Sequence, residues 1–126
     1  FCDLDGFKEI NDTYGHKMGD QVLITLAHEI RRLLRRDDVV ARIGGDEILL
    51  VLNGVHDLDG AVAVAEKVRA NCSEVHEYQG EQYVPRISIG VTVMRSGENV
   101  DDLIARADRA MYSVKRMGGN QVVGVN

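Results

Sequence analysis

A β-hairpin is predicted by the stretch VVARIGGDEILLVL, residues 39–52. Two apolar, β-branched runs flank Gly44-Gly45, and a glycine pair suits a tight turn between antiparallel strands. Because the run from Ile48 to Leu52 is apolar without a break, we expect it to be a central strand that is covered on both faces. Asp46 and Glu47 fall in the turn, so the hairpin carries two acids at its tip.

Strand-like and helical segments alternate along the rest of the chain. Short β-branched runs predict strands at Phe1 to Leu4, Arg86 to Val93 and Gln121 to Val125. Apolar residues at helical spacing predict three helices, whose apolar positions run from Val22 to Leu34, from Ala61 to Val75 and from Val100 to Val114. Asp20 lies in the opening turn of the first predicted helix, and Asn99 can cap the third. The order β-α-β-β-α-β-α-β predicts an α/β (α+β) fold with a ferredoxin-like βαββαβ sheet and flanking helices.

Length and composition indicate one globular domain without a membrane segment. The 126 residues are 44% hydrophobic and contain no apolar run near the roughly 20 residues of a spanning helix. A net charge of -5 argues against binding DNA or RNA. Cys2 and Cys72 form no metal or redox motif, which favours a reducing cytoplasm. The chain has no initiator Met and opens on Phe1 inside a predicted strand, so we expect residues 1–126 to be a domain lacking its N-terminal part.

Acidic side chains stand at two predicted strand ends. Asp3 ends the first strand, and Asp46 and Glu47 occupy the hairpin turn, which the predicted sheet brings beside the first strand. Two like charges about 4 Å apart repel by roughly 4 kcal/mol at an effective dielectric constant of 20, so a divalent cation between them is expected. Mg²⁺ fits best, since it prefers oxygen ligands and phosphate co-ligands. Alternatively, Asp46 and Glu47 are only solvated turn residues.

The polar segment that leads into the first predicted helix is expected to be a nucleotide-binding loop. Backbone amides near Gly6 and Phe7, with the ammonium of Lys8, can hold a polyphosphate. Asn11 and Asp20 suggest a base pocket that favours guanine, because a carboxylate matches the paired donors of that base and an amide can donate to its acceptors. The alternative is that Asp20 is an ordinary helix-start acid and Asn11 a turn former.

Several separated motifs occur together in one order. These are Asp3-Leu-Asp-Gly-Phe-Lys8, Asn11-Asp12, Gly15-His16, Gly19-Asp20, Arg42-Ile-Gly-Gly-Asp-Glu-Ile48 and the tail from Ala107 to Lys115 with Gly118 and Asn120. Together they resemble the GGDEF family of diguanylate cyclases over nearly the whole chain. The sequence departs from the family pattern at Ile48, in place of phenylalanine, and at Gly119, where the family often has a second phosphate-binding arginine.

The resemblance implies a palm-like fold that joins two GTP molecules into cyclic di-GMP and releases pyrophosphate, with one GTP held by each chain of a homodimer. It implies that Mg²⁺ or Mn²⁺ is ligated by Asp3, the backbone carbonyl of Leu4 and Asp46. Asp46 would also accept the proton of the attacking 3′-hydroxyl, with Glu47 in the same acidic turn, and Lys8 would stabilise charge in the transition state.

The resemblance also assigns the nucleotide contacts. Gly6, Phe7 and Lys8 would meet the phosphates, Asn11 and Asp20 would bind guanine, and Lys115 would reach the terminal phosphates.

Arg35 and Asp38 match the family's RxxD inhibitory site, at which cyclic di-GMP damps its own synthesis. An arginine can clasp a phosphate with two bonds, and an aspartate can accept from guanine. The alternative for Arg35 is a basic helix end that interacts with the helix dipole.

Two other classes of function stay open. One is a regulatory module that binds GTP or cyclic di-GMP without making product. The other is a ferredoxin-like interaction domain, since a fold alone does not choose a function. A membrane-attached parent protein also stays open.

Overall fold

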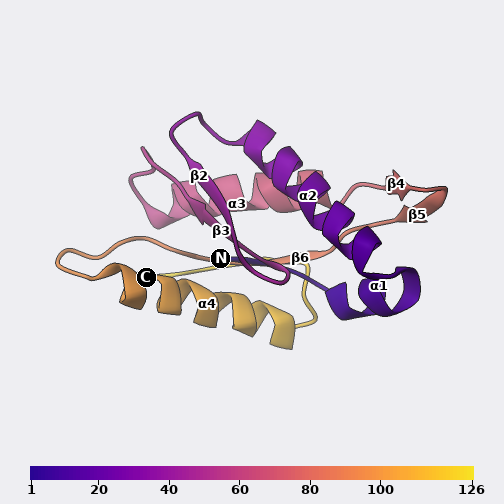
Figure 1. The fold of residues 1–126 in the computed structure, drawn as a ribbon. Coiled ribbons are helices and arrows are strands. Elements are labelled where there is room, and N and C mark those ends of the chain that lie inside the picture. Colours follow the sequence, from indigo (N-terminus) through magenta and orange to yellow (C-terminus); the bar gives the residue numbers. More distant parts are fainter.

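A five-stranded sheet forms the middle layer of the structure, a computed structural model that describes residues 1–126 (Figure 1). Its order is β2-β3-β1-β6-β7, and only the β6–β7 pair is parallel. The strands are β1 (Cys2–Leu4), β2 (Val39–Gly44), β3 (Glu47–Val51), β6 (Ile87–Thr92) and β7 (Val122–Val125). The ferredoxin-like order β2-β3-β1-β6 is therefore confirmed, and β7 extends the sheet beside β6.

Helices cover both faces of this sheet. The helices α2 (His16–Leu33) and α3 (Leu58–Cys72) lie on one face, and α4 (Val100–Arg116) lies on the other (Figure 1). The predicted cap of α4 is confirmed, because the Asn99 side chain accepts a hydrogen bond of 2.8 Å from the backbone N–H of Asp102. None of the helices combines the length and apolar composition that crossing a bilayer requires.

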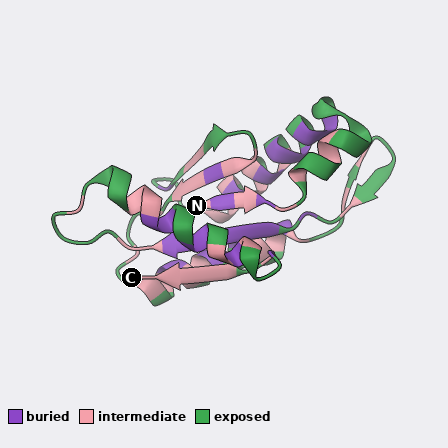
Figure 2. Ribbon diagram, turned by 90° about the horizontal axis from the view of Figure 1, so that it is seen from below, coloured by how far each residue is buried: buried purple, intermediate pink, exposed green.

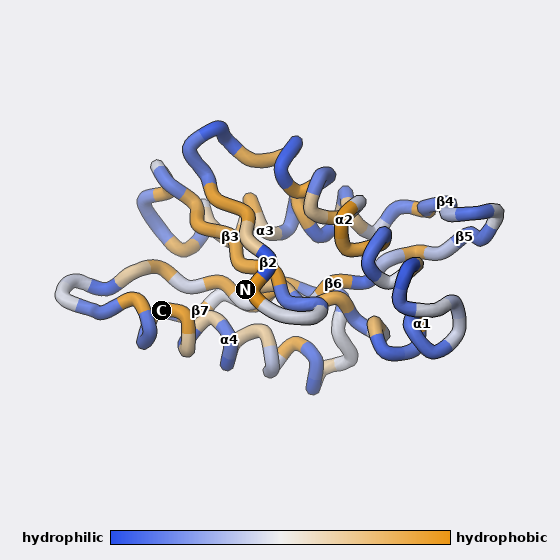
Figure 3. Tube along the Cα trace, in the orientation of Figure 1, coloured by the Kyte–Doolittle hydropathy of each residue, from blue (hydrophilic) through white to orange (hydrophobic).

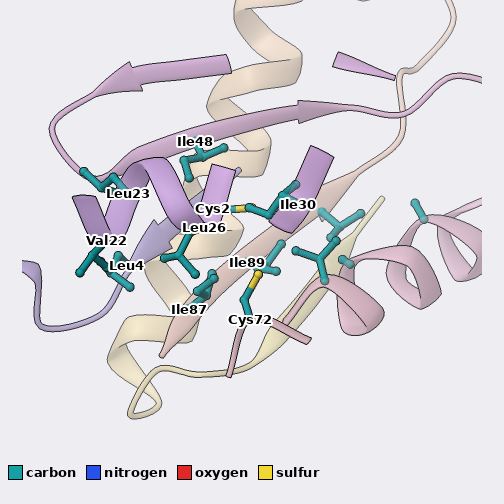
Figure 4. Packing of buried hydrophobic residues seen from close by; sticks show 14 of the residues in the cluster. Cys2, Leu4, Val22, Leu23, Leu26, Ile30, Ile48, Cys72, Ile87 and Ile89 are labelled. Atoms are coloured by element: carbon teal, nitrogen blue, oxygen red, sulfur yellow. The ribbon is translucent and has the colours of Figure 1, made fainter. Parts of the chain in front are cut away.

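The main core lies between the sheet and the pair α2 and α3. Figure 4 shows Leu26 and Ile30 of α2 packed toward Ile87 and Ile89 of β6, with Cys72 of α3 beside them. Figure 2 shows the buried residues gathered on the middle strands and on the inward sides of the helices. The core thus holds β1 and β6 side by side, and it thereby positions the residues that follow the end of β1 and precede the start of β6.

The strand buried on both faces is β6, not the predicted run from Ile48 to Leu52. Residues Ile87–Val91 are all buried, whereas β3 lies second from the edge and its Val51 is 43% exposed. The reason is that α4 covers β6 and β7, whereas Leu49 and Val51 of β3 line an apolar hollow. An unbroken apolar run therefore did not indicate the most buried strand.

The polar segment predicted as a loop is helical. It forms α1 (Phe7–Tyr14) and, after Gly15, the first turn of α2, which begins at His16 rather than near Asp20. Figure 3 shows α1 as largely hydrophilic, with few apolar positions to reveal its period. Phe7 and Ile10 nevertheless pack against the core, and this contact holds the helix in place.

One further expectation was wrong near the end of α3, and one pair of strands was not predicted. Val75 lies beyond the helix and is 64% exposed, because α3 ends at Cys72. A short antiparallel hairpin of β4 (His76–Tyr78) and β5 (Glu81–Tyr83) follows, which the sequence pattern did not predict.

Candidate active site

The end of β1 lies beside the tip of the β2–β3 hairpin. Asp3 stands opposite Glu47 in the antiparallel register, and the backbone N–H of Leu4 donates to the carbonyl of Asp46 over 3.3 Å. The side chains of Cys2 and Leu4 are buried on one face, and alternation along the strand turns Asp3 to the other. The structure therefore brings Asp3 and Asp46 together, as the sequence predicts.

Asp3 and Asp46 interact directly and unfavourably as a pair of anions. Burial, a hydrogen bond with Asp46 and the negative charge of Asp46 raise the pKa of Asp3 to about 7, and Lys115 opposes this rise. The Oδ1 atom of Asp3 is buried without a hydrogen-bond partner. A proton on Asp3 or a further cation beside the Lys115 ammonium would relieve the repulsion between the two carboxylates.

The donor set suits a hard divalent cation that keeps other oxygen ligands. No cluster of three or more His, Cys, Asp or Glu side chains is gathered into a metal site. If a cation were bound here, Asp3 and Asp46 could supply two carboxylates and the Leu4 carbonyl a neutral oxygen, with phosphate or water completing the shell. Mg²⁺ is commonly bound by one or two carboxylates with substrate phosphates, and the Oδ1 atom of Asp3, which is buried and accepts no hydrogen bond, fits that ion.

Lys115 reaches the same place from the last turn of α4. Its Nζ lies 3.0 Å from Oδ1 of Asp5 and 3.4 Å from Oδ1 of Asp3. Burial disfavours the ammonium, but the hydrogen bond to Asp5 and the charges of Asp3 and Asp5 outweigh it and raise the pKa of Lys115. A charged lysine therefore adjoins the paired acids.

Asp5, for which the sequence predicted no role, is the acid with the most hydrogen-bond partners at this site. Its carboxylate accepts hydrogen bonds from Ser88, Lys115 and the backbone of Asn120. The spacing of Asp3 and Asp5 was a usable signal, because alternate residues at a strand end share one side of the sheet.

The predicted phosphate-binding residues form the start of α1. Gly6 precedes the helix with φ 70° and supplies no side-chain cap, so the first-turn amides around Phe7 and Lys8 have no side-chain acceptor. Lys8 is exposed and forms no ion pair. Free amides at a helix N-terminus, with a nearby ammonium, suit an anionic ligand.

The predicted guanine-binding residues lie where α1 packs on α2. The Oδ1 atom of Asn11 is buried without a partner, and a Cβ atom at Gly19 would lie 1.9 Å from it. Asp20 is exposed, and its Oδ1 lies 3.6 Å from Nη2 of Arg42. Arg42 begins the motif that ends at Ile48, but the sequence predicted no role for its side chain. Its Nε donates to the Gly45 carbonyl over 2.9 Å, and with the contact to Asp20 it links the hairpin turn to α2.

Arg35 and Asp38 lie at the other end of the β2–β3 hairpin. Six residues of β2 separate that end from the tip, which is about 20 Å of extended chain. The Asp38 side chain is buried, and its two oxygens accept hydrogen bonds of 2.8 Å from the backbone N–H groups of Arg35 and Asn53. Asp38 thus fixes the turn, and exposed Arg35 is the member of the pair available to a ligand.

The family model described as "Diguanylate cyclase, GGDEF domain" matches residues 1–121. Diguanylate cyclase A of Treponema denticola is 41% identical over 95% of this chain and 33% of that protein. Diguanylate cyclase DgcM of Escherichia coli is 41% identical over 96% of this chain and 29% of that protein. The chain thus spans a third or less of these curated relatives.

Solved structures agree with the sequence matches. The GGDEF domain of YfiN (TpbB) from Pseudomonas aeruginosa has a TM-score of 0.93 at 33% identity, over 99% of this chain and 79% of that one. The GGDEF domain of DgcB from Caulobacter crescentus, solved in complex with c-di-GMP, has a TM-score of 0.86 at 31% identity, over 98% of this chain and 74% of that one. The α+β fold with the acidic hairpin tip defines the class, and the chain belongs to the GGDEF family of diguanylate cyclase domains.

Proposed function

We propose that residues 1–126 act as a diguanylate cyclase domain, which condenses two GTP molecules into cyclic di-GMP and releases pyrophosphate. One observation carries the proposal: the paired acids Asp3 and Asp46 meet at the end of β1 with the Lys115 ammonium beside them. Family membership and the named activities of the relatives support it.

Each step of the reaction would form one ester bond and break one anhydride bond. The 3′-oxygen of one GTP attacks the α-phosphorus of the other, the bond from that phosphorus to the bridging oxygen breaks, and pyrophosphate leaves. Asp46 accepts the proton of the hydroxyl, and Glu47 lies next to it in the turn. Mg²⁺ or Mn²⁺, held by Asp3, the Leu4 carbonyl and Asp46, would supply Lewis-acid stabilisation of phosphate charge.

The other predicted residues would bind and orient the nucleotide. The first turn of α1, at Gly6, Phe7 and Lys8, binds the phosphates, and Lys8 stabilises the charge that develops during transfer. Lys115 binds the terminal phosphates from the opposite side. The guanine would lie between α1 and α2, where Asn11 and Asp20 bind its edge.

The product has two new phosphodiester bonds, whereas each chain would hold one GTP, so catalysis needs a homodimer. Product inhibition would act through Arg35, with Asp38 holding the turn that presents it. This assignment accords with the positions of the two side chains at the hairpin end away from the acids.

GTP turnover tests the proposal. The protein is incubated with GTP and Mg²⁺, and the nucleotides are separated by chromatography. We expect cyclic di-GMP at a rate that rises faster than linearly with dilute protein, and no detectable product from Asp46→Asn. Asp37→Asn, an exposed acid in a turn, is the matched control. Normal product formation by Asp46→Asn would overturn the role of this acid.

A regulatory module that binds nucleotide without turnover is the second candidate. The observation that favours it is Gly119, which has φ 78° and lies so close to Asp5 that a Cβ atom would be 2.6 Å from the carboxylate. No side chain at this position contributes a second cation for the phosphates. Calorimetry distinguishes the two: tight cyclic di-GMP binding together with no GTP conversion would support the module.

A further inference from the structure

The Asp5 side chain joins segments that are far apart in the sequence. Its Oδ1 accepts from Oγ of Ser88 over 2.6 Å and from Nζ of Lys115 over 3.0 Å, and its Oδ2 accepts from the backbone N–H of Asn120 over 2.8 Å. Its own backbone N–H donates to the carbonyl of Arg86 over 2.7 Å. One residue thus connects the end of β1, the start of β6, the end of α4 and the turn that precedes β7.

These contacts hold the carboxylate firmly. The Asp5 side chain is only 17% exposed, and hydrogen bonds with a charged partner are stronger than neutral ones. Gly119 allows the turn after α4 to close on it, because any larger residue there would collide with the carboxylate. The Asp5 carboxylate is therefore held in one position at the end of β1.

The contact with the Asp5 carboxylate orients the Lys115 side chain. A lysine side chain has four rotatable bonds and a compact charge, so an unheld ammonium samples many positions. The closest acceptor of Nζ is Asp5, at 3.0 Å, against 3.4 Å for Asp3. Asp5 also directly precedes Gly6 and Phe7, whose amides begin α1. The same residue thus contacts Lys115 and lies next to the helix N-terminus in the chain.

We propose that Asp5 is a positioning residue that holds the Lys115 ammonium in register with the first turn of α1, so that the two grip the terminal phosphates of a nucleoside triphosphate. The inference rests on the proposed function and assigns to Asp5 a part in recognising the triphosphate rather than the base. If Asp5 had only a structural role, its substitution would lower the stability of the fold and weaken the binding of every guanine nucleotide to the same extent. If Asp5 positions Lys115, its substitution weakens only the binding of ligands that carry terminal phosphates, and it does so through Lys115.

Calorimetric titration with two probes tests this distinction in the presence of Mg²⁺. One probe is guanosine 5′-(α,β-methylene)triphosphate, whose carbon bridge prevents loss of pyrophosphate, and the other is GMP. For Asp5→Asn and for Lys115→Met we expect the triphosphate analogue to bind about tenfold more weakly, the effect of losing one charge-assisted contact, and GMP to bind as in the wild type. Asp108→Asn, an exposed acid of α4, is the control and should change neither affinity.

The double variant gives the decisive comparison. If Asp5 acts through Lys115, Asp5→Asn adds no further loss once Lys115→Met is present. Additive losses, or equal weakening of the analogue and GMP by Asp5→Asn, would overturn the inference while leaving GTP binding by the wild type intact. A wild type that does not bind the analogue would overturn the proposed function and the inference with it.

Ser88→Ala covers the case in which Asp5→Asn does not fold. It removes one hydrogen bond from the carboxylate but keeps the charge and fills a buried site with a slightly smaller residue. We expect about a twofold to threefold loss of affinity for the analogue and none for GMP. Unchanged affinity of Ser88→Ala for both probes would contradict the proposal that the position of the Asp5 carboxylate affects binding of the triphosphate.

Discussion

The side chains of Asp3 and Asp46 meet where β1 reaches the hairpin tip, and the pKa of Asp3 is raised first by burial and then by Asp46. Asp3 belongs to β1 and Asp46 to the turn between β2 and β3, 43 positions further along the chain. Their proximity makes the site costly as two anions and favourable around a cation. The properties of the site without a bound cation are therefore measurable.

Stability without metal should fall as pH rises, because of Asp3. Its pKa is raised to about 7 in the folded chain and is close to 3.9 in an unfolded one, so the folded state binds the proton more tightly. The stabilisation is complete below the unfolded pKa and is lost as pH rises through the folded pKa. With a chelator present, the melting temperature should drop more between about pH 5.5 and pH 8 in the wild type than in Asp3→Asn.

Added Mg²⁺ should reverse this drop for the wild type, since a bound cation stabilises the ionised pair. Parallel pH profiles for the wild type and Asp3→Asn under chelation would contradict the account of this carboxyl.

Gly19→Ala should weaken guanine binding although it favours the helix. Alanine is better than glycine inside a helix by up to about 1 kcal/mol. Here the new Cβ atom would lie 1.9 Å from Oδ1 of Asn11 and 3.2 Å from Cε1 of Phe7, so it would displace both side chains. We expect KM for GTP to rise severalfold, with kcat changed less. Gln21→Ala, an exposed position on the same helix, serves as control; an unaltered KM in Gly19→Ala would refute the steric argument.

Arg35 and Asp38 should separate into a binding and a structural residue. Asp38→Ala leaves two backbone N–H groups without their acceptor, which costs about 1–3 kcal/mol each when such groups are buried. Urea unfolding should therefore show a large decrease in the free energy of unfolding for Asp38→Ala and almost no decrease for Arg35→Ala. Calorimetry should show weaker cyclic di-GMP binding for Arg35→Ala, and unchanged affinity in that variant would remove Arg35 from the inhibitory site.

The sheet was predictable because its signals are local. The alternation around Ile87 and Ile89, the glycine pair at Gly44-Gly45 and the cap at Asn99 each specify an element without reference to the rest of the chain. The topology followed from their order, and the meeting of Asp3 and Asp46 followed from the topology.

The misjudged parts depend on contacts between distant segments. Helix α1 has few apolar residues, and only packing of Phe7 and Ile10 on the core shows why it forms. The burial of β6 results from the packing of α4 on it, and the sequence pattern of β6 does not indicate where α4 packs. Asp5 has partners up to 115 positions away, so its network became visible only in three dimensions.

Binding of Mn²⁺ is the most direct test of the central claim that Asp3 and Asp46 form a cation site for nucleotide chemistry. The protein is titrated with Mn²⁺ in the presence of guanosine 5′-(α,β-methylene)triphosphate, and free Mn²⁺ is followed by electron paramagnetic resonance. We predict saturable binding by the wild type and by Asp37→Asn, and loss of that binding in both Asp3→Asn and Asp46→Asn. Wild-type affinity for Mn²⁺ in either of the last two variants would contradict the claim.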